Sequence, residues 1–166
     1  MAEALVKRSQ KVAFYGVPGD SSATTYHRMT GFTEISKSAN PMEYTRQYVD
    51  EEYERSDIVG YSPEYSYAFD QFTESAVHTD IVAITDGELT GTDAVREIII
   101  VDMTKKGTPE NSFAAVKREF SVIPDSEGDT TEAYTYSGSL KVVGGRISGT
   151  ATSADGWKTI TFTEAE

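Results

Sequence analysis

The chain has no cysteine, and only one tryptophan and two histidines stand among its 166 residues. The absence of cysteine excludes disulfides, thiolate catalysis and thiolate metal sites. His27 and His78 are far apart and belong to no HExxH arrangement, so we expect them to be hydrogen-bonded residues rather than metal ligands. No segment is apolar enough for a membrane span or a signal peptide, which predicts a soluble protein without membrane contact.

Basic residues are also scarce. Fifteen Lys and Arg face 27 Asp and Glu, which gives a formal net charge of −12. Such a surface repels nucleic acid and anionic membranes at contact distance. The charge is consistent with simple solubility or with a wall along which nucleic acid passes without sticking, and composition alone leaves both interpretations open.

Motifs for catalysis or cofactor binding are missing. The glycine-containing segment 16–21 lacks the lysine and the spacing of a phosphate loop. Residues 125–129 lack the glycine position and the closing glutamate of a calcium loop. Glu51, Glu52 and Glu54 have no partner base nearby in the sequence, so a solvated loop explains them better than paired catalytic carboxylates. We therefore expect no enzyme activity and no cofactor.

What the chain does contain is alternation. Apolar and polar residues alternate with a period of two in many short segments, and this places each set on one face of a β-strand. The apolar segment 94–103 is predicted to be a central strand because it is apolar on both faces. The segments predicted as strands are residues 11–17, 26–36, 44–49, 65–70, 94–103, 112–123, 131–143, 146–152 and 157–163, with a turn at 124–129.

One segment has helical spacing instead. Val77, Ile81 and Ile84 recur every three to four residues, which predicts a helix over about 73–86 that Gly87 ends. A single helix needs a sheet on which to bury this apolar stripe. The chain is thus predicted to be one mainly β domain, residues 1–166, with two packed antiparallel sheets in a sandwich-like or barrel-like arrangement and one flanking helix. A flexible N-terminal arm is expected over residues 1–10.

The stretch between two alternating runs is strongly acidic. Residues 50–57 hold five acids and one base, which cannot pack inside a core. The tyrosines within and beside it argue against simple disorder, so we expect a long loop, about 49–62, that contacts another subunit. The residues assigned to that contact are Asp50, Glu51, Glu52, Tyr53, Glu54, Arg55 and Asp57.

Five segments together resemble the major tail tube proteins of long-tailed bacteriophages and related tail-like particles. They span most of the chain, and the resemblance lies in their order and wording rather than in a single motif. The segments are KVAFYGV (11–17), NPMEYTRQYVDEEYERSDIVGYSPEYSYAFDQF (40–72), AVREIIIVDM (94–103), VKREFSVIPDSEGDTTEAYTYSGSLKVVGG (116–145) and SGTATSADGW (148–157).

This resemblance implies a structural role. In that family, packed sheets with a flanking helix form hexameric rings, the rings stack into a tube, and a long loop reaches the adjacent ring. The implied partners are further copies of the chain and the tail terminator, baseplate or distal tail, and tape measure proteins. DNA would pass without specific binding, and the protein would belong to the virion tail after assembly in the host bacterial cytoplasm. Glu34, Asp70 and Glu119 are candidates for acids on the inner wall, and alternation alone does not say which of them faces inward.

Two other functions compete with this expectation. A tyrosine-rich β-sandwich could be a binding or adhesion module that uses its aromatic rings as a stacking platform. A hydrolase could work through the acidic cluster around Glu51 and Glu52. Assembly into rings would separate the first expectation from both alternatives.

Overall fold

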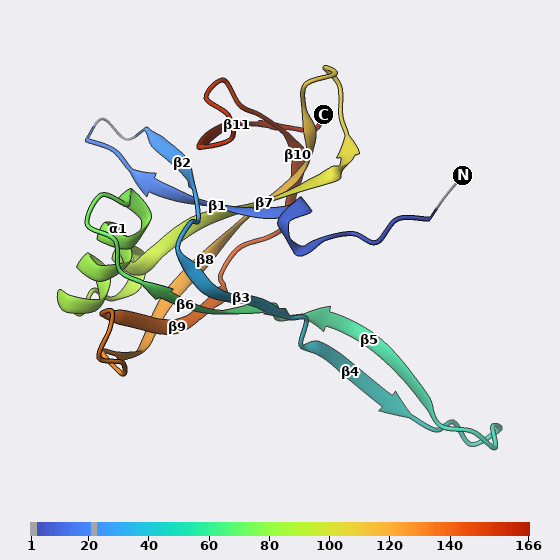
Figure 1. The fold of residues 1–166 in the computed structure, drawn as a ribbon. Coiled ribbons are helices and arrows are strands. Elements are labelled where there is room, and N and C mark those ends of the chain that lie inside the picture. Colours follow the sequence, from blue (N-terminus) through green and yellow to red (C-terminus); the bar gives the residue numbers. More distant parts are fainter. Residues whose placement is uncertain (1–2, 21–22) are drawn as a thin grey trace.

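The computed structural model describes residues 3–20 and 23–166, and β-strands dominate it (Figure 1). Within these ranges one α-helix and two short 3-10 turns accompany eleven strands. The mainly β fold with one flanking helix that the sequence predicts is therefore confirmed. In chain order the elements are η1 Arg8–Gln10, β1 Lys11–Pro18, β2 Thr24–Arg28, β3 Phe32–Ser38, β4 Pro41–Arg46, β5 Arg55–Tyr61, β6 Glu64–Asp70, α1 Ala76–Asp86, η2 Gly91–Ala94, β7 Val95–Lys106, β8 Phe113–Glu127, β9 Thr135–Val142, β10 Ile147–Thr152 and β11 Thr159–Glu164.

Nine of the strands form one antiparallel sheet in the order β10-β11-β2-β1-β7-β8-β9-β6-β3. Strand β10 also pairs with β8, so the strands from β10 to β8 close into a six-stranded barrel. The long strand β8 pairs with β10 through residues 113–117 and with β9 through residues 120–127. It therefore carries the sheet out of the barrel into a second layer made of β9, β6 and β3.

The barrel encloses the smaller of two cores. Its buried residues come from alternate positions on β1, β7 and β8 and from the two C-terminal strands. Closure removes free edges from the barrel strands and lets small residues such as Ala115 and Ala151 fill its narrow interior. The core residues are Val12, Phe14, Ile99, Val101, Ala115, Ala151 and Ile160.

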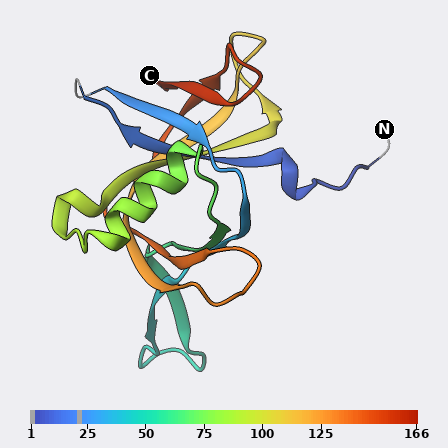
Figure 2. The same cartoon turned by 60° about the vertical axis from the view of Figure 1, so that its left-hand side comes forward.

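The larger core lies between the outer face of β1, β7 and β8 and the layer of β9 and β6, with α1 covering it. Val77, Ile81 and Ile84 of the helix are buried there, as their spacing predicts. The helix begins at Ala76 rather than near residue 73, because Ser75 caps it by accepting a hydrogen bond from the backbone N–H of His78 at 3.3 Å. Figure 2 shows α1 lying along one side of the molecule.

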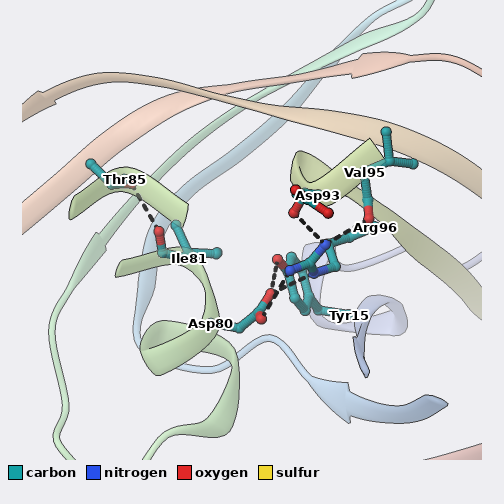
Figure 3. Close-up of polar contacts among 7 residues, drawn as sticks. All are labelled: Tyr15, Asp80, Ile81, Thr85, Asp93, Val95 and Arg96. Atoms are coloured by element: carbon teal, nitrogen blue, oxygen red, sulfur yellow. Dashed lines mark hydrogen bonds and ion pairs between the residues drawn. The ribbon is translucent and has the colours of Figure 1, made fainter. Parts of the chain in front are cut away.

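A polar network fixes the helix to the barrel (Figure 3). Asp80 accepts hydrogen bonds from the Tyr15 hydroxyl at 2.5 Å and from Nε of Arg96 at 2.8 Å. Arg96 also donates to the carbonyl oxygens of Asp93 and Val95, which ties η2 and the start of β7 to the same guanidinium. Burial raises the pKa of Tyr15 well above its ordinary value, and the neighbouring Asp80 carboxylate raises it further.

The structure corrects two predicted segments. Residues 26–36 are two strands rather than one, because Gly31 adopts φ +75° and sends β3 away from β2 to pair with β6. The predicted turn 124–129 is largely strand, because β8 continues to Glu127 through a bulge between Pro124 and Ser126 and keeps its pairing with β9.

The expected loop at about 49–62 is also shorter than predicted. Strand β5 occupies Arg55–Tyr61 and pairs with β4 in a separate two-stranded sheet, so only residues 47–54 lie between the two strands. The predicted N-terminal arm falls partly outside the described residues at positions 1 and 2. Residues 3–7 are exposed and form neither helix nor strand.

Candidate assembly surfaces

The hairpin β4–β5 projects away from the rest of the chain (Figures 1 and 2). Every residue of its two strands is exposed except Gly60, which is half-buried. Side chains with large apolar surfaces are among them, including Tyr44, Ile58, Val59 and Tyr61. A two-stranded hairpin with both faces in water is marginally stable on its own, so these residues form a surface that needs a partner.

Short-range contacts organise the hairpin. Thr45 and Ser56 are cross-strand partners whose hydroxyl oxygens lie 3.1 Å apart. The guanidinium of Arg46 lies over the ring of Tyr44, 5.7 Å from its centroid. These contacts are exposed and contribute little individually, so they set the shape of the hairpin without making it rigid.

Residues 47–54, the acidic tip, join the two strands. All seven residues predicted for the subunit contact lie on this hairpin: five in the acidic tip, and Arg55 and Asp57 on β5. Arg55 forms an ion pair with Glu51 and lies 5.9 Å from the centroid of the Tyr48 ring. Among the described residues no other acid of the acidic tip has an ion-pair partner, so its negative charge is largely uncompensated. The five tip residues are Asp50, Glu51, Glu52, Tyr53 and Glu54.

A second surface is the solvent side of the layer formed by β8, β9, β6 and β3. Most cross-strand partners on this side are polar: Ser36 stands opposite Ser66, and Ser66 opposite Ser139. Ala68 and Ile123 are the apolar exceptions on the described strands, and Ile123 is 40% exposed. Ser126 and Ser137 are partners whose hydroxyl oxygens lie 2.7 Å apart. We call this the polar face, and its residues are Glu34, Ser36, Ser38, Glu64, Ser66, Ala68, Asp70, Glu119, Ser121, Ile123, Ser126, Thr135, Ser137, Ser139 and Lys141.

The three acids expected on an inner wall all lie on the polar face. Glu34 is paired with Ala68, two residues before Asp70 on β6, so both acids lie on the same side of the layer. Glu119 precedes Ser121 by two residues on β8 and takes the same side by alternation. The polar face carries four acids and one lysine, Lys141, so it is negative.

Both histidines make contacts within the folded chain. His78 is completely buried, stacks on Phe69 with 4.3 Å between ring centroids, and lies with Nε2 2.7 Å from the carbonyl oxygen of Thr30. Its Nδ1 accepts a hydrogen bond from the backbone N–H of Phe72 at 3.1 Å, so Nε2 carries the proton in the neutral ring. Burial lowers the pKa of His78. His27 pairs within the sheet with Tyr15 and Thr159.

Within residues 3–20 and 23–166, no cluster of three or more His, Asp or Glu side chains is placed to hold a metal ion. No helix in the described part of the chain has the length and apolar character that a membrane crossing requires. Four of the five exposed tyrosines belong to the hairpin and its tip, namely Tyr44, Tyr48, Tyr53 and Tyr61. The exposed aromatic surface is therefore concentrated where a partner contact is expected.

The sequence does not predict one further surface of the molecule. A groove of about 320 Å³ opens between the outer side of β7, β8 and β10 and the adjoining ends of β3 and β6. Five basic side chains line it, although they are spread along the chain from Lys11 to Arg146. No sequence motif connects them, and only the pairing of distant strands brings them together. We call this the basic groove, and its basic residues are Lys11, Lys37, Lys105, Arg118 and Arg146.

Neither a model of a known protein family nor a curated protein matches the chain. The chain is similar to solved structures, however. The chain is similar to a component of the tail of an empty GTA particle with C6 symmetry, with a TM-score of 0.55, 14% identity, and 86% of this chain and 97% of that chain covered. It is also similar to a component of the six-fold symmetrised baseplate of the anti-feeding prophage, with a TM-score of 0.53, 8% identity, and coverage of 89% and 97%. The expected fold, shared with components of phage tail-like particles, is thereby confirmed.

Proposed function

We propose that the protein is a structural subunit of a phage tail or tail-like particle, and that it forms six-membered rings that stack into a tube. The observation that carries the proposal is the hairpin β4–β5, exposed on both faces and projecting from a fold that occurs in two assemblies of six-fold symmetry. An isolated monomer would leave this hairpin without a packing partner. In a stacked assembly, it would reach a neighbouring ring.

The polar face supports a second part of the proposal, that the tube conducts DNA. Its hydroxyl side chains are short, and its four acids outnumber its one base. Each phosphate that a Lys or Arg neutralises adds to a salt-sensitive attraction that would slow a moving duplex. A wall with Glu34, Asp70 and Glu119 on it would disfavour such contacts, so we assign the polar face to the lumen.

The remaining assignments follow from this role. The subunit acts through contacts rather than catalysis, its main partner is a further copy of itself, and its place is the tail of the particle, built in the cytoplasm of the bacterial host. Ends of the tube would meet terminator, baseplate or distal tail, and tape measure proteins. These partners would contact the same surfaces that ring subunits use with one another.

The test removes the acidic tip and leaves the strands. Residues 47–54 are replaced by a short Gly-Ser turn, so that β4 and β5 keep their register. Loop length changes closure entropy slowly, by about 0.6 kcal/mol per doubling, so the thermal unfolding midpoint should stay close to that of the parent chain. Electron microscopy should show single rings without stacks. Tubes of normal length from this variant would show that the hairpin tip makes no contact between rings.

A further inference from the structure

The basic groove has an apolar floor and a charged rim. Ile98 and Ile100 of β7 and Val116 of β8 form part of the floor, and Tyr65 stands at the wall. A second hollow continues from it and shares Lys37, Arg118 and Arg146. An occupant that combines apolar side chains with negative charge would match this arrangement.

The charge of the basic groove is unusual for this molecule. Its five cations face Asp102 alone, which leaves a local net charge of +4 in a chain of −12. Asp102 is already engaged, because it accepts hydrogen bonds from Thr104, and these bonds lower its pKa, as do Lys11 and Lys105 to a smaller extent. None of the five cations forms an ion pair with a described acid. The basic groove therefore holds cationic charge that the rest of the monomer leaves uncompensated.

The acidic tip has complementary properties. Residues 47–54 contain four acids and no base, which gives −4. Val49 is fully exposed, and Tyr53 is 79% exposed. The acidic tip thus offers three exposed side chains with apolar surface, Tyr48 included, beside four carboxylates, of which Glu51 is paired with Arg55.

The acidic tip of one chain cannot occupy the basic groove of the same chain. Ala39 and Tyr61 at the base of the hairpin line the hollow beside the basic groove. From there β4 and β5 lead away, as Figure 1 shows, and strands of six and seven residues at about 3.3 Å per residue put the start of the acidic tip roughly 20 Å from that base. An occupant with this chemistry must therefore come from another copy.

We propose that the basic groove receives the acidic tip of a second copy of this chain. The proposal rests on the proposed function and adds to it the surface that the hairpin contacts. Because acidic tip and basic groove are different surfaces, the contact is head-to-tail and can be repeated indefinitely, which suits stacked rings. Lys37 and Arg146 at the rim would meet the carboxylates, and the floor would cover Val49 or Tyr53.

Nucleic acid is a poorer occupant. The residues outside the basic groove carry a formal net charge of −16, so a duplex longer than the groove would lie against acidic surface. A phosphate backbone also offers no apolar side chain to the floor. The acidic tip supplies both negative charge and apolar side chains within eight residues.

Disulfide trapping tests the contact directly, since the chain has no cysteine of its own. One copy carries Tyr53→Cys and the other Gly145→Cys, a position next to Arg146 where an added Cβ meets nothing within 4 Å. Mixed and oxidised, this pair should yield a cross-linked dimer at least about tenfold above a control pair in which Glu132→Cys replaces Gly145→Cys, because charge complementarity favours the proposed encounter. The yield should fall at 1 M salt, where the screening length shrinks to about 3 Å. Equal yields for the two pairs would overturn the proposal.

Charge reversal provides a second measurement. Lys37→Glu with Arg146→Glu brings the net charge of the basic groove from +4 to zero, and Asp50→Lys with Glu52→Lys brings that of the acidic tip from −4 to zero, so either pair should stop stacking. Lys158→Glu, at an exposed lysine that lines neither hollow, should not. Mixing the two variants should restore the contact between the unaltered acidic tip of the groove variant and the unaltered basic groove of the tip variant, because −4 again meets +4 there. If the unaltered chain stacks and the groove variant stacks equally well, the groove proposal fails while the proposed function stands.

Two further outcomes separate the proposals. If the unaltered chain forms no rings or tubes but the Tyr53→Cys and Gly145→Cys copies still cross-link selectively, the groove contact stands and the proposed function fails. If the groove variant loses binding to a fluorescent single-stranded oligonucleotide while cross-linking of acidic tip to groove is unchanged, the groove is a nucleic-acid site and our proposal is wrong.

Discussion

Replacing Asp80 by alanine should destabilise the subunit severely, because the carboxylate joins three elements. Its side chain is 14% exposed and that of Arg96 is 11% exposed, so the pair is largely removed from water. The substitution leaves the guanidinium of Arg96 and the hydroxyl of Tyr15 without their acceptor. Breaking one partner of a buried ion pair costs about 3–5 kcal/mol.

For a chain of this size, each kcal/mol shifts the unfolding midpoint by about 2–4 °C, so Asp80→Ala should lower the midpoint by about 6–20 °C. Tyr15→Phe removes one donor but leaves the ion pair, and we expect a loss of about 1–2 kcal/mol. Glu74→Gln, an exposed acid close to the start of the same helix, is the matched control and should change the midpoint little.

The assay is thermal and urea unfolding followed by circular dichroism, with Asp80→Ala, Arg96→Ala and the double variant forming a cycle. The double variant should lose less than the two single losses combined, because the second substitution removes a charge that is already unpaired. A midpoint for Asp80→Ala within about 2 °C of the parent chain would refute the claim that this network holds the helix on the barrel.

Three more predictions concern the helix, His78 and the polar face. Ile81→Asp should unfold the subunit by burying an unpaired carboxylate at a cost of several kcal/mol, whereas Thr79→Asp on the exposed side should fold; a cooperative melt of Ile81→Asp near the parent midpoint would contradict the burial argument. Burial lowers the pKa of His78 below the ordinary 6.5, so the unfolded chain binds more protons than the folded chain and the free energy of unfolding should fall as the pH drops through 6.5. His78→Gln should flatten this dependence of unfolding free energy on pH in urea titrations between about pH 5.5 and 8, and an unchanged dependence would contradict the assignment. Glu34→Lys with Asp70→Lys should leave tubes intact but slow DNA release, and the effect should be larger at low salt. Unchanged release kinetics at two ionic strengths would contradict the assignment of the polar face to the lumen.

Much of the fold can be predicted from local patterns. Strands β1 and β7 bury both faces, and the apolar run of residues 94–103 predicts the central position of β7. The stripe of Val77, Ile81 and Ile84 identifies the helix and its buried side. These features depend on residues close in sequence, so periodicity alone reveals them.

Other features depend on pairing between distant segments. Alternation continues on both sides of Gly31, so the sequence shows one strand where the positive φ of that glycine separates two. Turn-forming residues at 124–129 predict a turn, but pairing with β9 outweighs that local preference. The acidic residues before and within β5 likewise predict a loop, although Ile58 and Val59 are β-branched and lie in the middle of this strand.

The candidate surfaces divide in the same way. A run of acids is visible in the sequence, and it lies on an exposed tip as predicted. The polar face needed the register of four strands, because parity assigns Glu34, Asp70 and Glu119 to faces but does not relate the faces of different strands. The basic groove was invisible, since its cations come from five separate segments that only the folded sheet brings together.

The central claim is that this chain assembles into stacked six-membered rings, and electron microscopy of the purified protein tests it most directly. Class averages and helical reconstruction would give both the symmetry of a ring and the contact between rings. The account predicts six-fold rings that stack into tubes, alone or when seeded by a tail initiator, with the hairpin β4–β5 of one ring against the next. A chain that stays monomeric at all concentrations, seeded and unseeded, or that forms rings of another symmetry, would contradict it.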